Sequence, residues 1–162
     1  MRASHRALLA CLAACAAAAH AGSVSVSFVD SERYSDVGFV PYEREANLKA
    51  LGRHFEAMGP RHLGADQVLR VTVTNVDLAG EPQPSVQRGS DLRIVRGRAD
   101  WPRISLRYIL ESNGEVLSSG EETVADLDYT HYVTLFGTQE PLTHEKRMLD
   151  RWFRERFAAP PR

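Results

Sequence analysis

Two carboxylates that lie close together in the sequence are the first candidates for chemistry in this chain of 162 residues. Asp77 and Glu81 flank a Leu-Ala-Gly segment, and paired carboxylates can perform acid–base catalysis when their environments separate their pKa values. A simpler interpretation is the end of a strand, where an aspartate accepts backbone hydrogen bonds and a glycine turns the chain. We favour this simpler interpretation and assign no catalytic residue.

A second group of side chains has the chemistry of metal ligands. Its members are Asp126, Asp128, His131, His144 and Glu145. Aspartate and histidine bind zinc or calcium, but the Asp-x-x-His spacing in this group is common in loops. Folding would also have to bring His144 close to the others. We therefore expect solvated loop or cap residues here, and neither a metal nor another cofactor.

The segment Asp100-Trp101-Pro102-Arg103 combines an aromatic ring with a cation. Tryptophan and arginine are the residue types that dominate the energetics of protein interfaces, so an exposed Trp101 beside Arg103 would be a binding anchor. The alternative is that Trp101 caps the hydrophobic core. Both interpretations stay open at this point.

Motifs of common catalytic and nucleotide-binding sites are missing from the sequence. It contains no GxGxxG or GxxxxGK[ST] loop for phosphates, no HExxH and no GxSxG. The 20 basic and 21 acidic residues give a net charge of −1, which provides no basic field for nucleic acid. We therefore expect no nucleic-acid partner.

Apolar periodicity predicts the strands that would position these residues. Alternating apolar and polar side chains indicate strands at residues 24–28, 69–78 and 92–95. Residues 104–124 are predicted to form a β-hairpin, because Asn113-Gly114 supplies the positive φ angles of a type I′ turn. Residues 82–91 are rich in Pro, Gln, Ser and Gly and are expected to form a loop.

Helical spacing of apolar residues predicts helices at 42–58 and 142–157. The first is expected to stop at Gly59-Pro60. In the second, Thr143 is the expected N-cap and Glu145 a favourable charge in the first turn. This order of elements predicts an α+β fold, with two helices packed on one face of a mainly antiparallel sheet of about four to five strands.

The start of the chain predicts export. Two arginines precede an Ala, Leu and Cys run at residues 7–19, and Ala19-His20-Ala21 is a signal-peptidase site. Residues 1–21 are therefore predicted to be a secretory signal peptide, and the expected location is the periplasm. Its removal, with two basic residues, leaves residues 22–162 as a single α+β domain of 141 residues, with a net charge of −3 and no cysteine.

A lipoprotein signal is the alternative fate of this leader. Leu12-Ala13-Ala14-Cys15 is similar to a bacterial lipobox, in which Cys15 would be lipidated and become the first residue. Acyl chains would then hold the protein on a membrane, because each buried methylene contributes about 0.8 kcal/mol. A membrane partner is expected only in that case.

Three segments together resemble a bacterial family catalogued as domain of unknown function 3016. They are residues 73–81, 100–108 and 145–153, and the residues near the start of the domain that also fit are Val26, Phe28, Tyr34 and Asp36. The resemblance implies a Gram-negative, exported, single-domain protein, and it implies no activity. The order of elements is also similar to that of small α+β envelope accessory lipoproteins, a likeness of fold that does not imply function.

The function expected from these observations is a periplasmic or envelope-associated binding or assembly-accessory module, with an envelope protein as its partner. The residues to be tested first for binding are Asp77, Glu81, Asp100, Trp101, Arg103, Arg107 and Lys146, with Tyr108 added by the resemblance. One alternative is a hydrolase that uses carboxylates near Asp77 and Glu81 or near Asp126 and Asp128. Another alternative is a carrier of a small apolar ligand held between sheet and helices.

Overall fold

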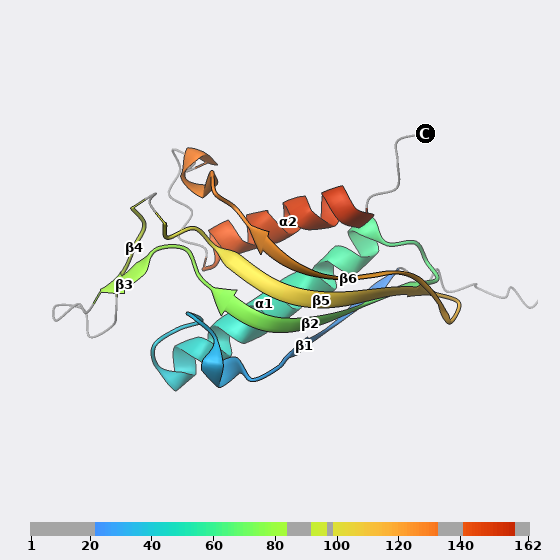
Figure 1. Cartoon of the computed structure of the whole chain (residues 1–162), viewed down its shortest axis with the longest axis horizontal. Coiled ribbons are helices and arrows are strands. Elements are labelled where there is room, and N and C mark those ends of the chain that lie inside the picture. The colour runs from blue at the N-terminus through green and yellow to red at the C-terminus, as the bar shows by residue number, and fades with distance from the viewer. Residues whose placement is uncertain (1–21, 84–91, 97–98, 133–140, 158–162) are drawn as a thin grey trace, which may run out of the picture.

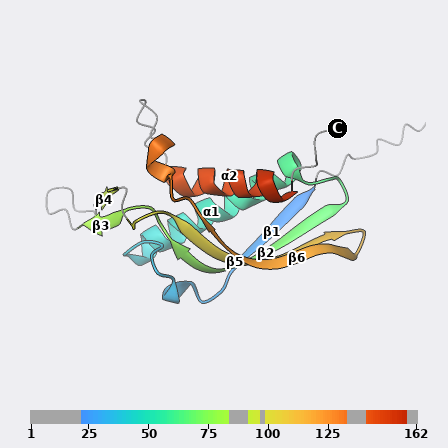
Figure 2. The ribbon, with the colours of Figure 1, turned by 45° about the horizontal axis from the view of Figure 1, so that its top comes forward.

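The protein has two layers, a twisted sheet and a pair of helices on one of its faces (Figure 1). The computed structural model describes residues 22–83, 92–96, 99–132 and 141–157. Helices α1 (Pro41–His62) and α2 (Thr143–Phe157) lie side by side on the same face of the sheet, as Figure 2 shows. The predicted α+β class is confirmed, and so is the packing of two helices on one face.

The main sheet has four strands, in the order β1 (Ser23–Phe28), β2 (Gln67–Asp77), β5 (Arg103–Ser112) and β6 (Glu115–Ala125). β1 pairs with β2 in parallel, because α1 carries the chain back between them. The other two pairings are antiparallel. The sheet is therefore mixed but mainly antiparallel, as expected.

A separate two-stranded hairpin extends from one end of the main sheet. Its strands are β3 (Glu81–Gln83) and β4 (Leu92–Ile94), which pair antiparallel. The predicted strand at 92–95 is thus present, although it belongs to this hairpin. The predicted loop at 82–91 is wrong at its first two residues, which lie in β3, and residues 84–91 are outside the described part of the chain.

Helix α1 is one turn longer than predicted. The expected stop at Gly59-Pro60 is wrong, because the helix continues to His62 and the Leu63 amide donates to the Gly59 carbonyl at 2.9 Å. Gly59 has a packing role instead. A Cβ at this position would lie 2.7 Å from the Gly22 carbonyl oxygen, so only glycine allows α1 to approach the start of β1 so closely.

The β5–β6 hairpin confirms the predicted turn. Asn113 and Gly114 have φ angles of 50° and 85°, the left-handed values that a type I′ turn requires. A register shift between Leu110 and Glu111 leaves one extra residue on β6, a β-bulge near the tip.

The core lies between the inner face of the sheet and the two helices. Its fully buried side chains include Leu51, Phe55, Leu69, Val73, Ile104, Leu106, Leu149 and Phe153. On β5 the alternate residues Arg103, Arg107 and Ile109 are exposed on the open face of the sheet. In the described residues, no helix is long and apolar enough to cross a membrane.

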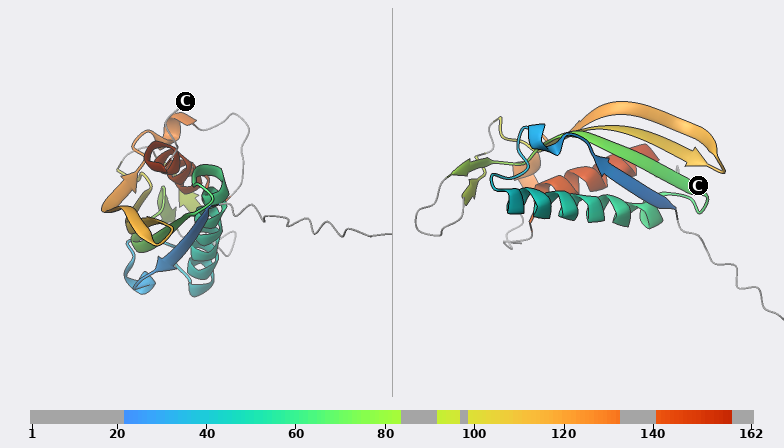
Figure 3. Two further views of the ribbon diagram at one scale, coloured as in Figure 1. Left: turned by 90° about the vertical axis from the view of Figure 1, so that its right-hand side faces the viewer. Right: turned by 90° about the horizontal axis from the view of Figure 1, so that it is seen from below.

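The two ends of the sheet carry different features. At one end, the start of β1 and the β5–β6 turn lie together, because Ser23 pairs with Val68 and Gln67 pairs with Ser112. At the other end lie the β3–β4 hairpin and the first turns of both helices, as the right-hand view in Figure 3 shows. The candidate site is at this second end.

Candidate functional site

The turn of residues 78–80, directly after β2, joins several segments of the chain. Its three backbone amides donate, in order, to the Asp36 carbonyl, the Glu145 carboxylate and the Asp100 carbonyl, at 3.2, 2.7 and 2.8 Å. These acceptors come from the loop before α1, the first turn of α2 and the segment before β5. The 78–80 turn therefore fixes the relative positions of elements that are distant in the sequence.

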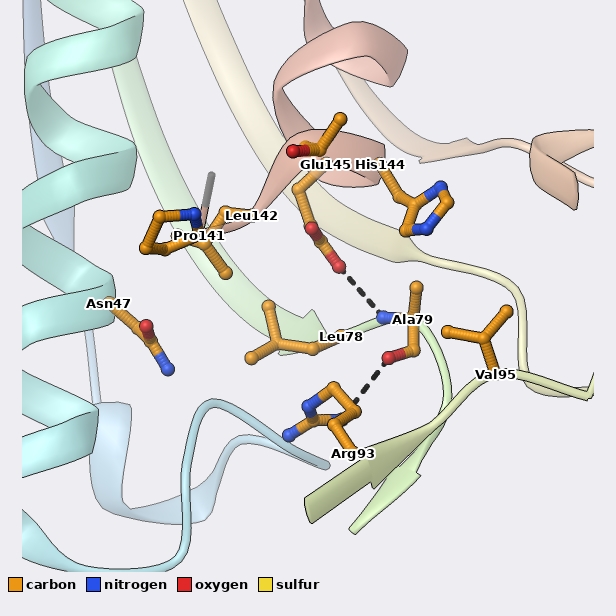
Figure 4. Close-up of a pocket in the computed structure, with 10 residues that line it drawn as sticks. Asn47, Leu78, Ala79, Arg93, Val95, Pro141, Leu142, His144 and Glu145 are labelled. Carbon is orange, nitrogen blue, oxygen red and sulfur yellow. Dashed lines mark hydrogen bonds between the residues drawn. The ribbon is translucent and has the colours of Figure 1, made fainter. Parts of the chain in front are cut away.

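Arg93, from β4, fastens the same turn from its other side (Figure 4). Its guanidinium makes two hydrogen bonds to the Asp36 carboxylate, at 2.7 and 3.1 Å, and donates to the Gly80 carbonyl at 2.9 Å. A bidentate, charge-assisted pair is both strong and directional. Arg93 therefore anchors the β3–β4 hairpin to the main body of the protein.

Glu145 is a buried carboxyl at this junction. It is 3% exposed, and this burial raises its pKa, an effect that the hydrogen bond from Ala79 partly opposes. The expectation that Glu145 and Asp126 are solvated is wrong, because both are buried. Asp126 is instead paired with Arg151, 3.2 Å from its carboxylate oxygen.

Four of the residues selected from the sequence gather at this end of the sheet. The Arg103 guanidinium pairs with Asp77, with its Nε at 2.9 Å, and lies over the Trp101 ring at 5.7 Å. The Asp100 carboxylate accepts the Tyr129 hydroxyl at 2.7 Å and the Arg96 amide at 2.8 Å. These contacts fasten the start of β5 to its neighbours.

The other selected residues are arranged differently. Glu81 lies 3.7 Å from Arg96, so it does not share a partner with Asp77. Arg107 is halfway along β5 on the open face, and Lys146 is on α2, where its carbonyl contacts His54 at 3.0 Å. The structure therefore places Arg107 away from the junction and Lys146 next to Glu145 in the first turn of α2, and Cys15 lies outside the described residues.

A groove lies beside the junction, between the β3–β4 hairpin and the first turns of both helices. It consists of three neighbouring cavities of about 320, 320 and 200 Å³. The smallest cavity shares Asn47 and Arg93 with one neighbour and Phe39 and Pro82 with the other. We call this continuous surface the groove.

Exposed apolar side chains stand at the rim of the groove. Phe39 and Val40, directly before α1, are 60% and 51% exposed, and Tyr42 in the first turn of α1 is 80% exposed. Phe39 also lines two of the cavities. Phe39 therefore presents an aromatic ring to solvent at a concave surface, and Tyr42, which lines none of the three cavities, is a second exposed ring nearby in the sequence.

Several of these residues were not selected from the sequence. Arg93 and Asp36 are 57 residues apart, and nothing local marks them as a pair. Phe39 precedes the predicted helix 42–58 and Tyr42 is its first residue, and neither was assigned a role from the sequence. Tyr42 is not part of the apolar spacing of Leu48, Leu51, Phe55 and Met58, which is the signal that could have predicted its exposure.

Two carboxylates at the groove are already engaged in contacts within the protein. The carboxylates of Asp36 and Glu145 are held by Arg93 and by the Ala79 amide, so they serve to position elements. In the described residues, no three acidic, histidine or cysteine side chains are arranged to hold a metal ion. The remaining lining of the groove is mixed: Phe39, Pro82 and Val95 are apolar, whereas Arg44, Asn47 and Thr143 are charged or polar.

Comparisons with known proteins identify the family of this chain. A family model described as "Protein of unknown function (DUF3016)" matches residues 22–155. Neither the curated proteins nor the solved structures gave a match. Within the matched residues, the three segments 73–81, 100–108 and 145–153 meet at the 78–80 turn through the Glu145 and Asp100 contacts.

Proposed function

We propose, from the premise that this chain belongs to the DUF3016 family of proteins of unknown function, that it is an exported binding module of the cell envelope. Its ligand is a segment of an envelope protein, held in the groove. The observation that carries this proposal is the exposure of Phe39, which lines a concave surface, with Tyr42 exposed three residues further along the chain.

The exposed rings support a protein partner. Phenylalanine and tyrosine are enriched in the cores of protein interfaces, where they bury a large area at a small cost in side-chain entropy. Adjacent exposed apolar residues of this kind mark interaction sites on soluble proteins. The contact of such a patch with water is unfavourable, so a partner that covers Phe39, Val40 and Tyr42 would be stabilised by their burial.

The shape of the groove favours an extended segment. Each cavity, at about 200 to 320 Å³, is at or below the lower limit of a pocket for a drug-sized molecule. Three such cavities in a row suit successive side chains of one peptide. The Asn47 amide, which donates to the Val37 carbonyl at 3.0 Å, keeps its oxygen as an acceptor for a peptide amide.

The two alternative functions have less support. A carrier of a small apolar ligand would use the space between sheet and helices, where the rings of Phe55 and Phe153 contact each other at 6.2 Å. A hydrolase would need two carboxylates acting together, but Asp77 pairs with Arg103 and Glu81 with Arg96. We therefore favour the binding module.

The position of the groove suits a tethered or released envelope protein. The groove is at the end of the sheet opposite the start of β1, where the chain enters the domain. If Cys15 carries a lipid, the seven residues 16–22 span at most about 25 Å. The groove would then face away from the membrane, towards a partner in the periplasm.

Site-directed photocrosslinking tests this function. A photoreactive phenylalanine analogue in place of Tyr42 is expected to crosslink one defined segment of an envelope protein, and a synthetic peptide of that segment is expected to bind the mature protein. The double variant F39S/Y42S should bind this peptide with an affinity at least tenfold lower than that of the wild type. The melting temperature of the variant should be unchanged, because both side chains are exposed.

The matched control places the same photoreactive residue at Glu56, an exposed position on the outer side of α1. Crosslinking of the same products from position 56, or a peptide affinity that F39S/Y42S leaves unchanged, would contradict the groove as the binding site.

A further inference from the structure

Strand β6 forms one edge of the main sheet, and the first part of this edge is open. The hydrogen bonds from α2 to β6 in the described part of the chain fall on Glu122, which accepts from Trp152 and Arg156, and on the Ala125 carbonyl. Residues 115–119 and Glu121, by contrast, are exposed. Alternate residues of an edge strand direct their N–H and C=O groups away from the sheet, where another strand can pair with them.

The side chains of this open edge have a distinct chemistry. Val116 and Leu117 are 61% and 52% exposed, and Glu115 and Glu121 stand at its two ends. Strand β6 contains three glutamates and neither lysine, arginine nor proline. Proteins protect an edge with charged residues, above all lysine, with proline or with a β-bulge. The β6 edge has the bulge at Leu117 and two glutamates, but neither lysine nor proline, and it displays apolar side chains between its glutamates.

We propose that residues 115–121 of β6 are a second binding surface, which pairs with an extended basic segment of a partner protein. The partner strand would satisfy the free backbone groups of β6 and cover Val116 and Leu117 with its own apolar residues. Its lysine or arginine side chains would pair with Glu115 and with Glu121, which has Arg107 of β5 opposite it on its other side, because opposite charges on adjacent strands are stabilising.

A second copy of the chain fits this edge poorly. An antiparallel copy of β6 centred on Ser118 would place Glu115 opposite Glu121, and like charges directly opposite each other are destabilising. The edge strand on the other side of the sheet, β1, has the sequence SVSVSF and carries no cation for these glutamates. The charges of the edge therefore favour a different protein as the partner.

Hydrogen exchange of the full mature protein tests this surface with synthetic probes. The probe is a capped peptide of alternating valine and lysine, and its controls are a valine–glutamate and a lysine–glycine peptide of equal length. We expect the valine–lysine peptide alone to slow amide exchange in residues 115–121 at least tenfold. Equal protection by the lysine–glycine peptide would overturn the proposal, because that peptide carries the charge without the tendency to form a strand.

A charge reversal sharpens the result. The variant E115K/E121K changes two exposed side chains. It should melt somewhat below the wild type, because position 121 lies directly opposite Arg107, so both proteins are compared at a temperature where both are folded. In this variant the valine–lysine peptide is expected no longer to slow amide exchange in residues 115–121, and the valine–glutamate peptide is expected to slow it instead. Unchanged binding of the basic peptide would overturn the proposal, and so would protection located at the groove. Variant F39S/Y42S should bind the basic peptide with the affinity of the wild type. The proposals for the β6 edge and for the groove can therefore be contradicted independently of each other.

Discussion

The carboxylate of Glu145 accepts the backbone amide of Ala79 at 2.7 Å, although 66 residues separate them in the sequence. This bond connects the first turn of α2 to the residue that follows the end of β2 by two positions. Because the carboxyl is buried, its protonation state contributes to the stability of the whole junction.

The stability of this junction is expected to depend on pH through Glu145. Burial raises the pKa of this carboxyl above its ordinary value of 4.5, so the folded protein binds its proton more tightly than the unfolded chain does. The resulting stabilisation is complete below about pH 4.5 and is lost as the pH rises through the folded pKa. Variant E145Q, which keeps an oxygen acceptor for Ala79, should show a smaller decrease in the free energy of unfolding over this range.

The comparison between wild type and E145Q isolates this effect. His62 acts with the opposite sign, because desolvation lowers its pKa and its contribution falls as the pH drops below about 6.5. Urea unfolding of both proteins from pH 4 to 8 gives a difference curve in which His62 cancels. A flat difference curve would show that Glu145 titrates alike in the folded and unfolded chains.

Gly80 is expected to be far less tolerant of substitution than Gly114. Both have left-handed backbones, with φ angles of 77° and 85°, but a Cβ at position 80 would lie 2.7 Å from the Ile94 carbonyl oxygen. At Gly114 the structure has nothing within 4 Å. We expect Gly114→Ala to cost about 1 kcal/mol and Gly80→Ala roughly 3 kcal/mol, since strain and a backbone clash combine. The free energy of unfolding of both variants is measured by thermal unfolding. If both variants lose the same amount, the 78–80 turn can relax to accommodate the Cβ.

Asp36 and Arg93 are expected to be energetically coupled. Each is only partly exposed, and their two hydrogen bonds join the loop before α1 to β4. A double-mutant cycle with D36N and R93M should give a coupling free energy of roughly 1–3 kcal/mol, measured by urea unfolding. If the losses in the free energy of unfolding of the two single variants simply add, the Asp36–Arg93 pair contributes little to stability. Arg93 would then be anchored by its hydrogen bond to the Gly80 carbonyl alone.

The export prediction is tested by the mass of the mature protein. Cleavage after Ala21 would leave a chain that begins at Gly22, whereas a lipoprotein would begin at Cys15 and carry acyl chains. We expect the first of these masses after expression in a Gram-negative host. A full-length mass that includes Met1 would contradict the signal peptide itself, and a mass beginning at Cys15 would establish the alternative.

The elements of the fold were largely predictable because their signals are local. The alternation of Leu69, Val71 and Val73 places one face of β2 in the core, and Asn113-Gly114 fixes the β5–β6 turn. The misplaced end of α1 shows the limit of such signals. Gly59 resembles a helix stop in the sequence, but it is there because β1 packs against it.

The candidate site was predictable only in part. Asp77, Asp100, Trp101 and Arg103 were selected because of their residue types, and the structure does bring them to one end of the sheet. Their partners were not predictable, since Arg103 and Asp77 are 26 residues apart. Local spacing suggests which residues carry chemistry, but not which of them are used up in pairing with one another.

The sequence by itself determined the α+β class, the strands and helices and the turn chemistry, because periodicity and left-handed turn residues act over a few positions. Only the tertiary structure decided that Asp36 and Arg93 form a pair, that Glu145 is buried and that Phe39 lines a groove. The reason is physical. Burial and long-range hydrogen bonds depend on how the two helices close over the sheet, and no local pattern of residues specifies that contact.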